Sequence, residues 1–247
     1  MKLWREWIKK LRKADGARGY ACDSCGAELF DYPIHRLCAD CEEKLLKTGE
    51  RFCEKCGRAT RAAGVCLTCK SSVPKFTKGF SPFPYVGTAA KLVNRMKNGN
   101  PRLALYLGER MATYLLSKTQ ETEWIVTSVP TTKQRLKARG YNQAEELAKS
   151  VANAIENAGK IVLLDCEVLQ KKRENSAQKE LGFSDRAKNI AGTFHLHKRK
   201  LVQNKTVLLV DDIMTTGATG NACAELIVNA GAKAVYFLTA VATPELQ

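Results

Sequence analysis

The chain has 247 residues, of which 45% are hydrophobic and 26% are charged. This length suits one large domain or two smaller ones, and the composition excludes general disorder and a fibrous protein. The formal net charge of +15 favours anionic partners such as nucleic acid, anionic lipid or phosphate-rich small molecules. No stretch approaches the roughly 18 consecutive apolar residues of a membrane-spanning helix, and the basic N-terminus lacks the apolar core of a signal peptide. We therefore expect a cytoplasmic protein with reduced thiols.

The N-terminal segment MKLWREWIKKLRKA shows the spacing of an amphipathic helix. Its apolar positions are Leu3, Trp4, Trp7, Ile8 and Leu11, and lysine and arginine occupy the other face. This pattern predicts a basic amphipathic helix within residues 1–19. The helix either docks its tryptophan face on the protein body or binds a membrane surface or a partner.

The rest of the chain divides into three predicted regions. Residues 20–70 are rich in cysteine, residues 71–84 form a proline-containing linker, and residues 85–247 form an α/β domain. Apolar runs in this domain predict strands at 124–130, 161–169, 206–212 and 234–242, and helices are predicted at 140–159 and 218–232. Strands that alternate with helices indicate a mainly parallel sheet that is covered on both faces.

Four Cys-x-x-Cys pairs follow one another in the cysteine-rich region. The two-residue spacer lets both sulfurs of a pair face one tetrahedral ion, and a second pair completes the site. We predict two structural Zn²⁺ sites, one formed by Cys22, Cys25, Cys38 and Cys41 and the other by Cys53, Cys56, Cys66 and Cys69. Interleaved pairing and redox dithiols are the alternatives. His35 is either a substitute ligand or a surface residue.

The segment VLLVDDIMTTGAT, residues 207–219, places two carboxylates and a turn of small residues between a strand and a helix. A helix N-terminus presents unpaired N–H groups and the positive end of a dipole, and Gly217 permits the dihedral angles of a phosphate-binding turn. Asp211 and Asp212 suit sugar hydroxyls or a hydrated Mg²⁺ ion beside the phosphate. The alternative is a strand, a turn and a helix with ordinary caps.

This segment resembles the phosphoribosyl-pyrophosphate (PRPP) loop of type I phosphoribosyltransferases. The resemblance implies that Asp211 and Asp212 bind the 2′- and 3′-hydroxyls of the ribose. It also implies that the turn holds the 5′-phosphate of PRPP, which arrives with Mg²⁺. The matching turn residues are Thr215, Thr216, Gly217, Ala218 and Thr219.

Residues 129–148 and 178–194, the PRPP-like loop and the cysteine-rich region together resemble the ComF (ComFC/GntX) family. The run Arg-Gly-Tyr-Asn-Gln at residues 139–143 is the most specific part, and the resemblance covers residues 20–243. It implies a type I phosphoribosyltransferase fold, in which a parallel sheet is flanked by helices, with an N-terminal double zinc ribbon.

The resemblance also implies where pyrophosphate binds. In related transferases a short loop after a core strand contacts pyrophosphate, and residues 129–132, with Pro130 and Thr131, match that loop. Arg135 and Arg139, with Lys133 and Lys137, then neutralise the diphosphate. Alternatively, these cations form the solvated start of a basic helix.

A substrate-covering loop is expected at residues 171–190, which lack strong periodicity. Type I transferases have a mobile loop in this part of the chain, and its closure excludes water. The resemblance implies that Gln178, Arg186 and Asn189 matter, whereas an ordinary surface loop is the alternative. Outside these motifs, Cys166 and Cys223 are predicted to be buried, inert thiols in a strand and a helix.

The family resemblance favours a pentosyl-type glycosyltransferase that moves a phosphoribosyl group from PRPP to a nitrogen nucleophile and releases pyrophosphate. The sequence shows no obvious general base and does not identify the acceptor. A ComF protein is also expected to act in natural competence, so single-stranded DNA and a competence DNA helicase are predicted partners, and the positive charge fits DNA contact. The alternatives are a non-catalytic DNA- or helicase-binding protein and a regulator that senses PRPP.

Overall fold

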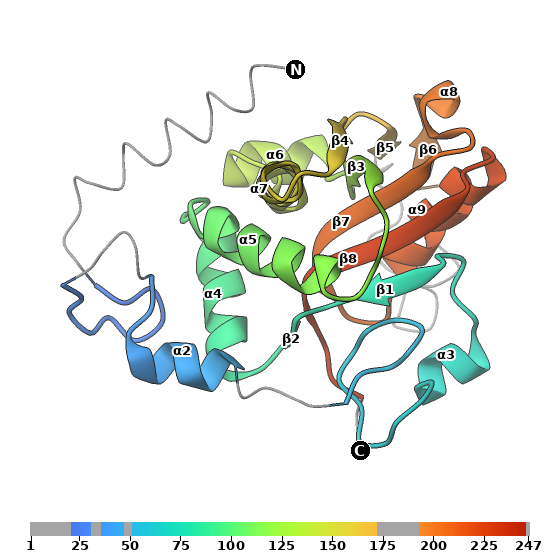
Figure 1. The fold of residues 1–247 in the computed structure, drawn as a ribbon. Coiled ribbons are helices and arrows are strands. Elements are labelled where there is room, and N and C mark those ends of the chain that lie inside the picture. Colours follow the sequence, from blue (N-terminus) through green and yellow to red (C-terminus); the bar gives the residue numbers. More distant parts are fainter. Residues whose placement is uncertain (1–20, 31–35, 47–50, 172–192, 246–247) are drawn as a thin grey trace, which may run out of the picture.

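The computed structural model describes residues 21–30, 36–46, 51–171 and 193–245 (Figure 1). The predicted N-terminal helix, His35 and residues 172–190 of the predicted substrate-covering loop lie outside this part of the chain. Among the described residues, no helix is both long enough and apolar enough to cross a membrane.

A parallel sheet forms the centre of the molecule. Its strands are β1 (Lys78–Phe80), β2 (Phe83–Pro84), β3 (Glu123–Ser128), β4 (Ile161–Leu164), β7 (Thr206–Met214) and β8 (Ala234–Ala242). They follow the order β1-β8-β7-β3-β4, with β2 also on β8, and every pair is parallel. A separate antiparallel pair consists of β5 (Leu169–Lys171) and β6 (Phe194–Leu196).

The central strand β7 shows why its sequence forms part of such a sheet. Val207 and Leu209 belong to one hydrophobic cluster, and Leu208 and Val210 belong to another. All four side chains are fully buried. Because successive side chains point to opposite faces of a strand, a continuous apolar run requires cover on both faces. The predicted parallel sheet with two covered faces is confirmed.

Helices cover the two faces of the sheet separately. On one face lie α4 (Gly87–Lys97), α5 (Leu103–Leu116) and α7 (Gln143–Asn157), and on the other lies α9 (Ala218–Asn229) (Figure 1). The shorter helices are α2 (Ala39–Leu46), α3 (Leu67–Ser71), α6 (Lys133–Arg139) and α8 (Arg199–Val202). The predicted α/β class is therefore confirmed.

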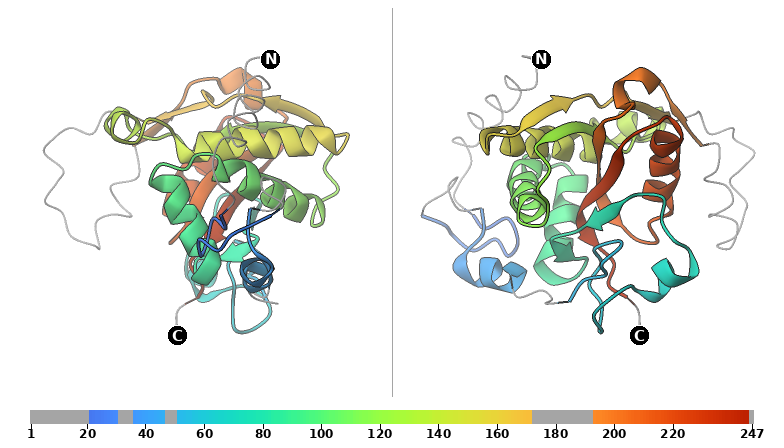
Figure 2. Two further views of the ribbon diagram at one scale, coloured as in Figure 1. Left: turned by 90° about the vertical axis from the view of Figure 1, so that its left-hand side faces the viewer. Right: turned by 45° about the vertical axis from the view of Figure 1, so that its right-hand side comes forward.

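The cysteine-rich region forms two modules on opposite faces of the sheet (Figure 2). The first module, the described part of residues 21–46, packs against α4 and α5, and Leu37 and Leu45 belong to their hydrophobic cluster. The second module, residues 51–76, packs on the α9 side, where the rings of Phe76 and Phe237 lie 5.5 Å apart. The first module therefore packs on helices of one face, and the second contacts the sheet itself on the other face.

Residues 78–84 lie inside the stretch that was predicted as a linker, and there they form β1 and β2. Both strands pair with β8 at the edge of the sheet. Glycine and proline are tolerated in short edge strands, which explains why this stretch has the composition of a linker. The second module is consequently joined directly to the sheet.

Several elements differ from the predictions. The predicted strand 161–169 is divided into β4 and β5, because Asp165 Oδ1 accepts a hydrogen bond from the Glu167 N–H at 2.9 Å and starts a turn. Cys166 lies in this turn rather than in a strand and is only partly buried, whereas Cys223 is buried in α9 as predicted. Helices α4 and α5 have no counterpart among the predicted elements.

Candidate functional site

The connections of the sheet diverge at the carboxyl ends of β3 and β7, and we call this edge of the sheet the crevice. From β3 the chain continues to β4 on one side, and from β7 it continues to β8 on the other side. In open parallel sheets, ligands bind where the connections diverge in this way. Ser128 is in register with Val210, and the N–H of Val129 donates to the Val210 carbonyl at 2.9 Å. The loop after β3 therefore adjoins the residues that follow Val210.

The two aspartates follow Val210 at this edge of the sheet. The N–H of Asp212 donates to Asp211 Oδ1 at 2.8 Å, and Lys97 Nζ from α4 lies 3.0 Å from Asp212 Oδ2. The side chains of Lys97 and Asp212 are 23% and 14% exposed, so the ion pair is shielded from solvent. Lys97 thus neutralises one of two adjacent carboxylates.

Lys97 is a site residue that the sequence analysis missed. Apolar residues at positions 89, 92, 93 and 96 have helical spacing and are buried in the structure. That spacing could have predicted α4, and with it a helix that ends in a lysine. The contact with Asp212 could not have been predicted, because it joins residues far apart in the sequence.

The pKa of Asp211 is higher than that of an ordinary aspartate. Burial and the charge of Asp212 raise the pKa of Asp211 to about 8, and the N–H of Asp212 and the charge of Lys97 oppose the rise only in part. A carboxyl group offers both oxygens as acceptors to two hydroxyl donors only when it is ionised, because the protonated form uses one oxygen as an O–H donor. We therefore expect ligand binding at this edge to be coupled to release of a proton near neutral pH.

The pH dependence of stability tests this feature. An unfolded aspartate titrates at about pH 3.9, so between that value and about pH 8 the folded protein holds the extra proton. The contribution of Asp211 to the free energy of unfolding is therefore complete below the pKa of the unfolded state. It declines as the pH rises and is lost above the pKa of the folded state. Asp211→Asn removes the effect. Its free energy of unfolding relative to wild type is expected to rise by about 1–3 kcal/mol between about pH 5 and pH 9.

Urea unfolding of both proteins across this pH range measures the difference. The exposed carboxylate of Asp40, which forms an ion pair with Lys44 on α2, provides the control variant Asp40→Asn. This control is expected to show no gain with pH. A flat difference between Asp211→Asn and wild type would mean that Asp211 titrates like an ordinary aspartate.

The turn after β7 opens directly into α9. Gly217 is the N-cap of α9 and has a φ of 82°, a conformation that favours glycine. The N–H of Ala218 donates to Thr216 Oγ1 at 3.3 Å, and Thr215 and Thr216 are exposed. The first turn of a helix has N–H groups without helical partners, which suits an anion. The turn is therefore open to a ligand beside the two aspartates.

The Arg-Gly-Tyr-Asn-Gln run supports the loop after β3. Gly140 ends α6 with a φ of 79°, and Asn142 caps α7, which explains why the predicted helix 140–159 begins only at Gln143. Asn142 Nδ2 donates to the Val129 carbonyl at 3.3 Å, and the Tyr141 hydroxyl donates to a carbonyl of α4 immediately before Lys97. This run therefore braces both sides of the crevice.

Helix α6 is an exposed basic element next to the loop after β3. Thr132 caps it by accepting a hydrogen bond from the Arg135 N–H at 3.2 Å, and all of its side chains are exposed. Its cations are Lys133, Arg135, Lys137 and Arg139. Arg139 Nη1 also donates to Gln143 Oε1 at 3.2 Å. Both the predicted diphosphate contact and the alternative of a solvated basic helix are consistent with this placement.

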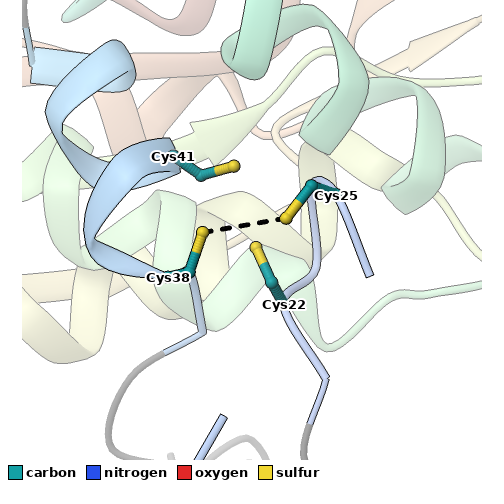
Figure 3. Close-up of side chains that lie close together, drawn as sticks. All are labelled: Cys22, Cys25, Cys38 and Cys41. Atoms are coloured by element: carbon teal, nitrogen blue, oxygen red, sulfur yellow. Dashed lines mark hydrogen bonds between the residues drawn. The ribbon is translucent and has the colours of Figure 1, made fainter. Parts of the chain in front are cut away.

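The eight paired cysteines converge in two sets of four. All four sulfurs of each set lie within 4.8 Å of one another, and the sets follow the chain in sequence rather than interleaving. Figure 3 shows the four cysteine side chains of the first set close together. Cys25 Sγ lies 3.7 Å from Cys38 Sγ, and Cys56 Sγ lies 3.8 Å from Cys66 Sγ. Zn–S bonds of about 2.3 Å in a tetrahedron place sulfurs about 3.8 Å apart. Both sets fit one zinc ion each.

The second set is the more enclosed one. All four of its cysteines are buried, whereas Cys25 of the first set is exposed. Burial by itself raises the pKa of Cys53, but the N–H groups of Cys66 and Cys56 donate to its sulfur at 3.3 and 3.5 Å and bring the pKa to about 7. Backbone donors of this kind favour the thiolate that a metal site requires.

Comparison with known proteins agrees with the fold. The family described as "Phosphoribosyl transferase domain" matches residues 105–247. Over 202 residues the chain is 31% identical to "Competence protein ComFC" of Streptococcus pneumoniae. This alignment covers 81% of this chain and 84% of that protein. The chain belongs to the ComF family of phosphoribosyltransferase-fold proteins.

Two further relatives of this ComF protein are more distant. "DNA utilization protein YhgH" of Escherichia coli is 25% identical over 205 residues, or 81% of this chain and 87% of that protein. "Competence protein ComFC" of Bacillus subtilis is 22% identical over 206 residues, or 81% of this chain and 80% of that protein. These alignments are longer than the matched transferase domain, so the similarity extends into the N-terminal half of the chain.

The structure of the ComF protein brings together most of the residues that the sequence singled out. The aspartates, the turn at residues 215–219 and the loop with Pro130 and Thr131 share one edge of the sheet. Gln178, Arg186 and Asn189 lie outside the described residues. The sequence analysis missed Arg58 of the second module, whose Nη2 donates to the Thr215 carbonyl at 2.7 Å.

Proposed function

We propose that this ComF protein binds PRPP together with Mg²⁺ in the crevice between β3 and β7. One observation supports this proposal: a pair of carboxyl groups, the open N-terminus of α9 and the loop after β3 lie at the same edge of the sheet. At this edge the connections of the sheet diverge. Asp211 and Asp212 bind the ribose hydroxyls, residues 215–219 bind the 5′-phosphate, and Pro130 and Thr131 approach the pyrophosphate.

Carboxylate oxygens at the crevice fit the hard-oxygen chemistry that Mg²⁺ prefers. When bound with PRPP, Mg²⁺ reduces the negative charge of the diphosphate and stabilises it as a leaving group. Arg135 and Arg139 add positive charge from α6 on the same side. Transfer replaces the bond from ribose C1 to pyrophosphate by a bond from C1 to a nitrogen nucleophile, whose proton is released.

Calorimetric titration with PRPP, with and without Mg²⁺, tests the proposal. We expect binding of one PRPP per chain that is stronger with Mg²⁺ than without it, because the metal screens the diphosphate against Asp211 and Asp212. Absence of binding at saturating PRPP and Mg²⁺ would contradict it. A panel of nitrogen acceptors, with pyrophosphate release as the readout, then decides between transfer and PRPP sensing.

We also propose that the protein acts on single-stranded DNA during DNA uptake, with a competence DNA helicase as a partner. The names of its relatives refer to competence and to DNA utilization. The exposed cations of α6 and the net charge of +15 give the protein the character of a phosphate binder. Affinity for a single-stranded oligonucleotide should fall steeply with salt, and absence of binding at low salt would end this part of the proposal.

Each cysteine set, in this proposal, holds one structural Zn²⁺ ion. The sulfur positions of both sets support it. Residues 20–70 then form a double zinc ribbon, and the chain from residue 85 onward forms the transferase-like domain. The zinc ions cross-link each module and stabilise its structure. The proposed reaction takes place at the crevice, not at the zinc ions.

A further inference from the structure

We infer that Arg58 of the second cysteine module positions the phosphate-binding turn, so that the second zinc site is coupled to PRPP binding. This inference rests on the proposed function of the crevice. Arg58 is 6% exposed, and its Nη2 donates to the Thr215 carbonyl at 2.7 Å across 157 positions of sequence. A buried guanidinium that reaches a loop of another part of the fold requires a structural reason.

The contact fixes the direction of a peptide group. In a trans peptide, the carbonyl of one residue and the N–H of the next point in opposite directions. With Arg58 on the Thr215 carbonyl, the N–H of Thr216 points away from the guanidinium. That N–H belongs to the turn that opens α9, where amide donors are proposed to bind the 5′-phosphate. Arg58 therefore acts through the backbone of the turn and is a positioning residue.

The metal site fixes the position of Arg58. Arg58 follows the ligand Cys56 by two residues, and its carbonyl accepts a hydrogen bond from the N–H of Cys53 at 2.8 Å. Both cysteines belong to the second set. Four thiolates around one divalent ion leave a net negative charge beside the Arg58 guanidinium, which offsets part of the cost of burying it.

The second module also packs closely against the sheet near Cys56. The N–H of Gly79 on β1 donates to the Lys55 carbonyl at 2.7 Å. The backbones approach so closely that a Cβ on Gly57 would lie 2.6 Å from Gly79 O, and one on Gly79 would lie 2.6 Å from Cys56 O. So close a backbone contact prevents the turn at Cys56 and Gly57 from moving along β1. The module, the sheet edge and Arg58 thus form one rigid support.

A cavity lies next to Arg58, where the second module faces α9. A cavity of about 320 Å³ lies between the second module and the start of α9, and its lining includes Arg58, Cys69, Phe76, Gly217 and Asn221. Arg58 Nε has no hydrogen-bond partner among the described residues. Close packing therefore does not hold the turn here, and the bond from Arg58 to Thr215 bears more of the positioning. Loss of that bond leaves the turn room to shift.

The test separates the two ends of the ligand. Ribose 5-phosphate reports on the turn, and pyrophosphate with Mg²⁺ reports on the loop after β3. Arg58→Ala is expected to keep two zinc ions per chain, to weaken ribose 5-phosphate binding about tenfold or more, and to leave pyrophosphate binding unchanged. Arg58→Lys should give an intermediate loss. Arg51 is an exposed arginine of the same module that donates to the Arg61 carbonyl, so Arg51→Ala is the matched control and should bind like wild type.

Two results would overturn the inference. One is wild-type affinity for ribose 5-phosphate in zinc-loaded Arg58→Ala, and the other is an equal loss for both ligands, which indicates general loosening. If Arg58→Ala does not fold, Arg58→Lys provides the same comparison. Should the wild type bind neither ligand, the proposed function fails, and the NMR chemical shifts of the Thr216 and Gly217 amides still decide the positioning role. These shifts change in Arg58→Ala and stay as in wild type in Arg51→Ala if the inference is right, and they are unchanged in Arg58→Ala if it is wrong.

Discussion

Replacing Asp211 and Asp212 together by asparagine is expected to abolish PRPP binding, with an affinity loss of about 100-fold or more. Two ionised acceptors for the ribose hydroxyls are lost at once, and hydrogen bonds to charged groups contribute about 1.5–3 kcal/mol each. The fold should survive, because relief of the repulsion between the two adjacent carboxyl groups offsets the lost ion pair between Asp212 and Lys97. Calorimetric titration with PRPP and Mg²⁺ measures the loss.

Asp40→Asn is the control for this experiment, since Asp40 is an exposed carboxylate of α2 in the first module. It should bind PRPP like wild type. Circular dichroism and thermal unfolding establish that the double variant is folded. Unchanged PRPP affinity in a folded double variant would remove the carboxylate pair from the site.

Loss of zinc from the second module is expected to have the largest effect on stability. Structural Zn²⁺ contributes an apparent binding free energy of about 10–16 kcal/mol in small zinc modules at neutral pH. Cys69→Ser should therefore release or weaken one zinc ion and lower the free energy of unfolding by at least several kcal/mol. The module packs on the α9 side of the sheet and pairs with β1, so its loosening reaches the core.

Zinc content by atomic absorption and urea unfolding measure both parts of this expectation. Cys25→Ser should have a smaller effect on stability, because Cys25 of the first set is exposed and Cys69 is buried. Cys166→Ser changes a thiol outside both sets and should retain two zinc ions. Two zinc ions and wild-type stability in Cys69→Ser would show that the second set is not a zinc site.

The sequence predicted the parts of the fold where local pattern and tertiary environment agree. The apolar runs of β7 and β8 have the composition of buried strands, and the turn with Gly217 has the composition of a helix start. They form these elements in the structure. The regular Cys-x-x-Cys spacing likewise predicted two tetrahedral thiol clusters. Only the three-dimensional structure could decide between sequential and interleaved pairing.

Other parts depend on contacts that leave little trace in the sequence. β1 and β2 are short edge strands with glycine and proline, so their pairing with β8 determines their structure more than their own residues do. Lys97 and Arg58 reach the crevice from α4 and from the second module, over long sequence separations. Their types are ordinary for surface residues, and only burial and geometry distinguish them.

The crystal structure of the protein grown with PRPP and Mg²⁺ tests the central claim most directly. We predict density for the 5′-phosphate against the amides of residues 215–219 and for the ribose hydroxyls against Asp211 and Asp212. PRPP bound away from the crevice, or an empty crevice at saturating ligand, would contradict this account of the site.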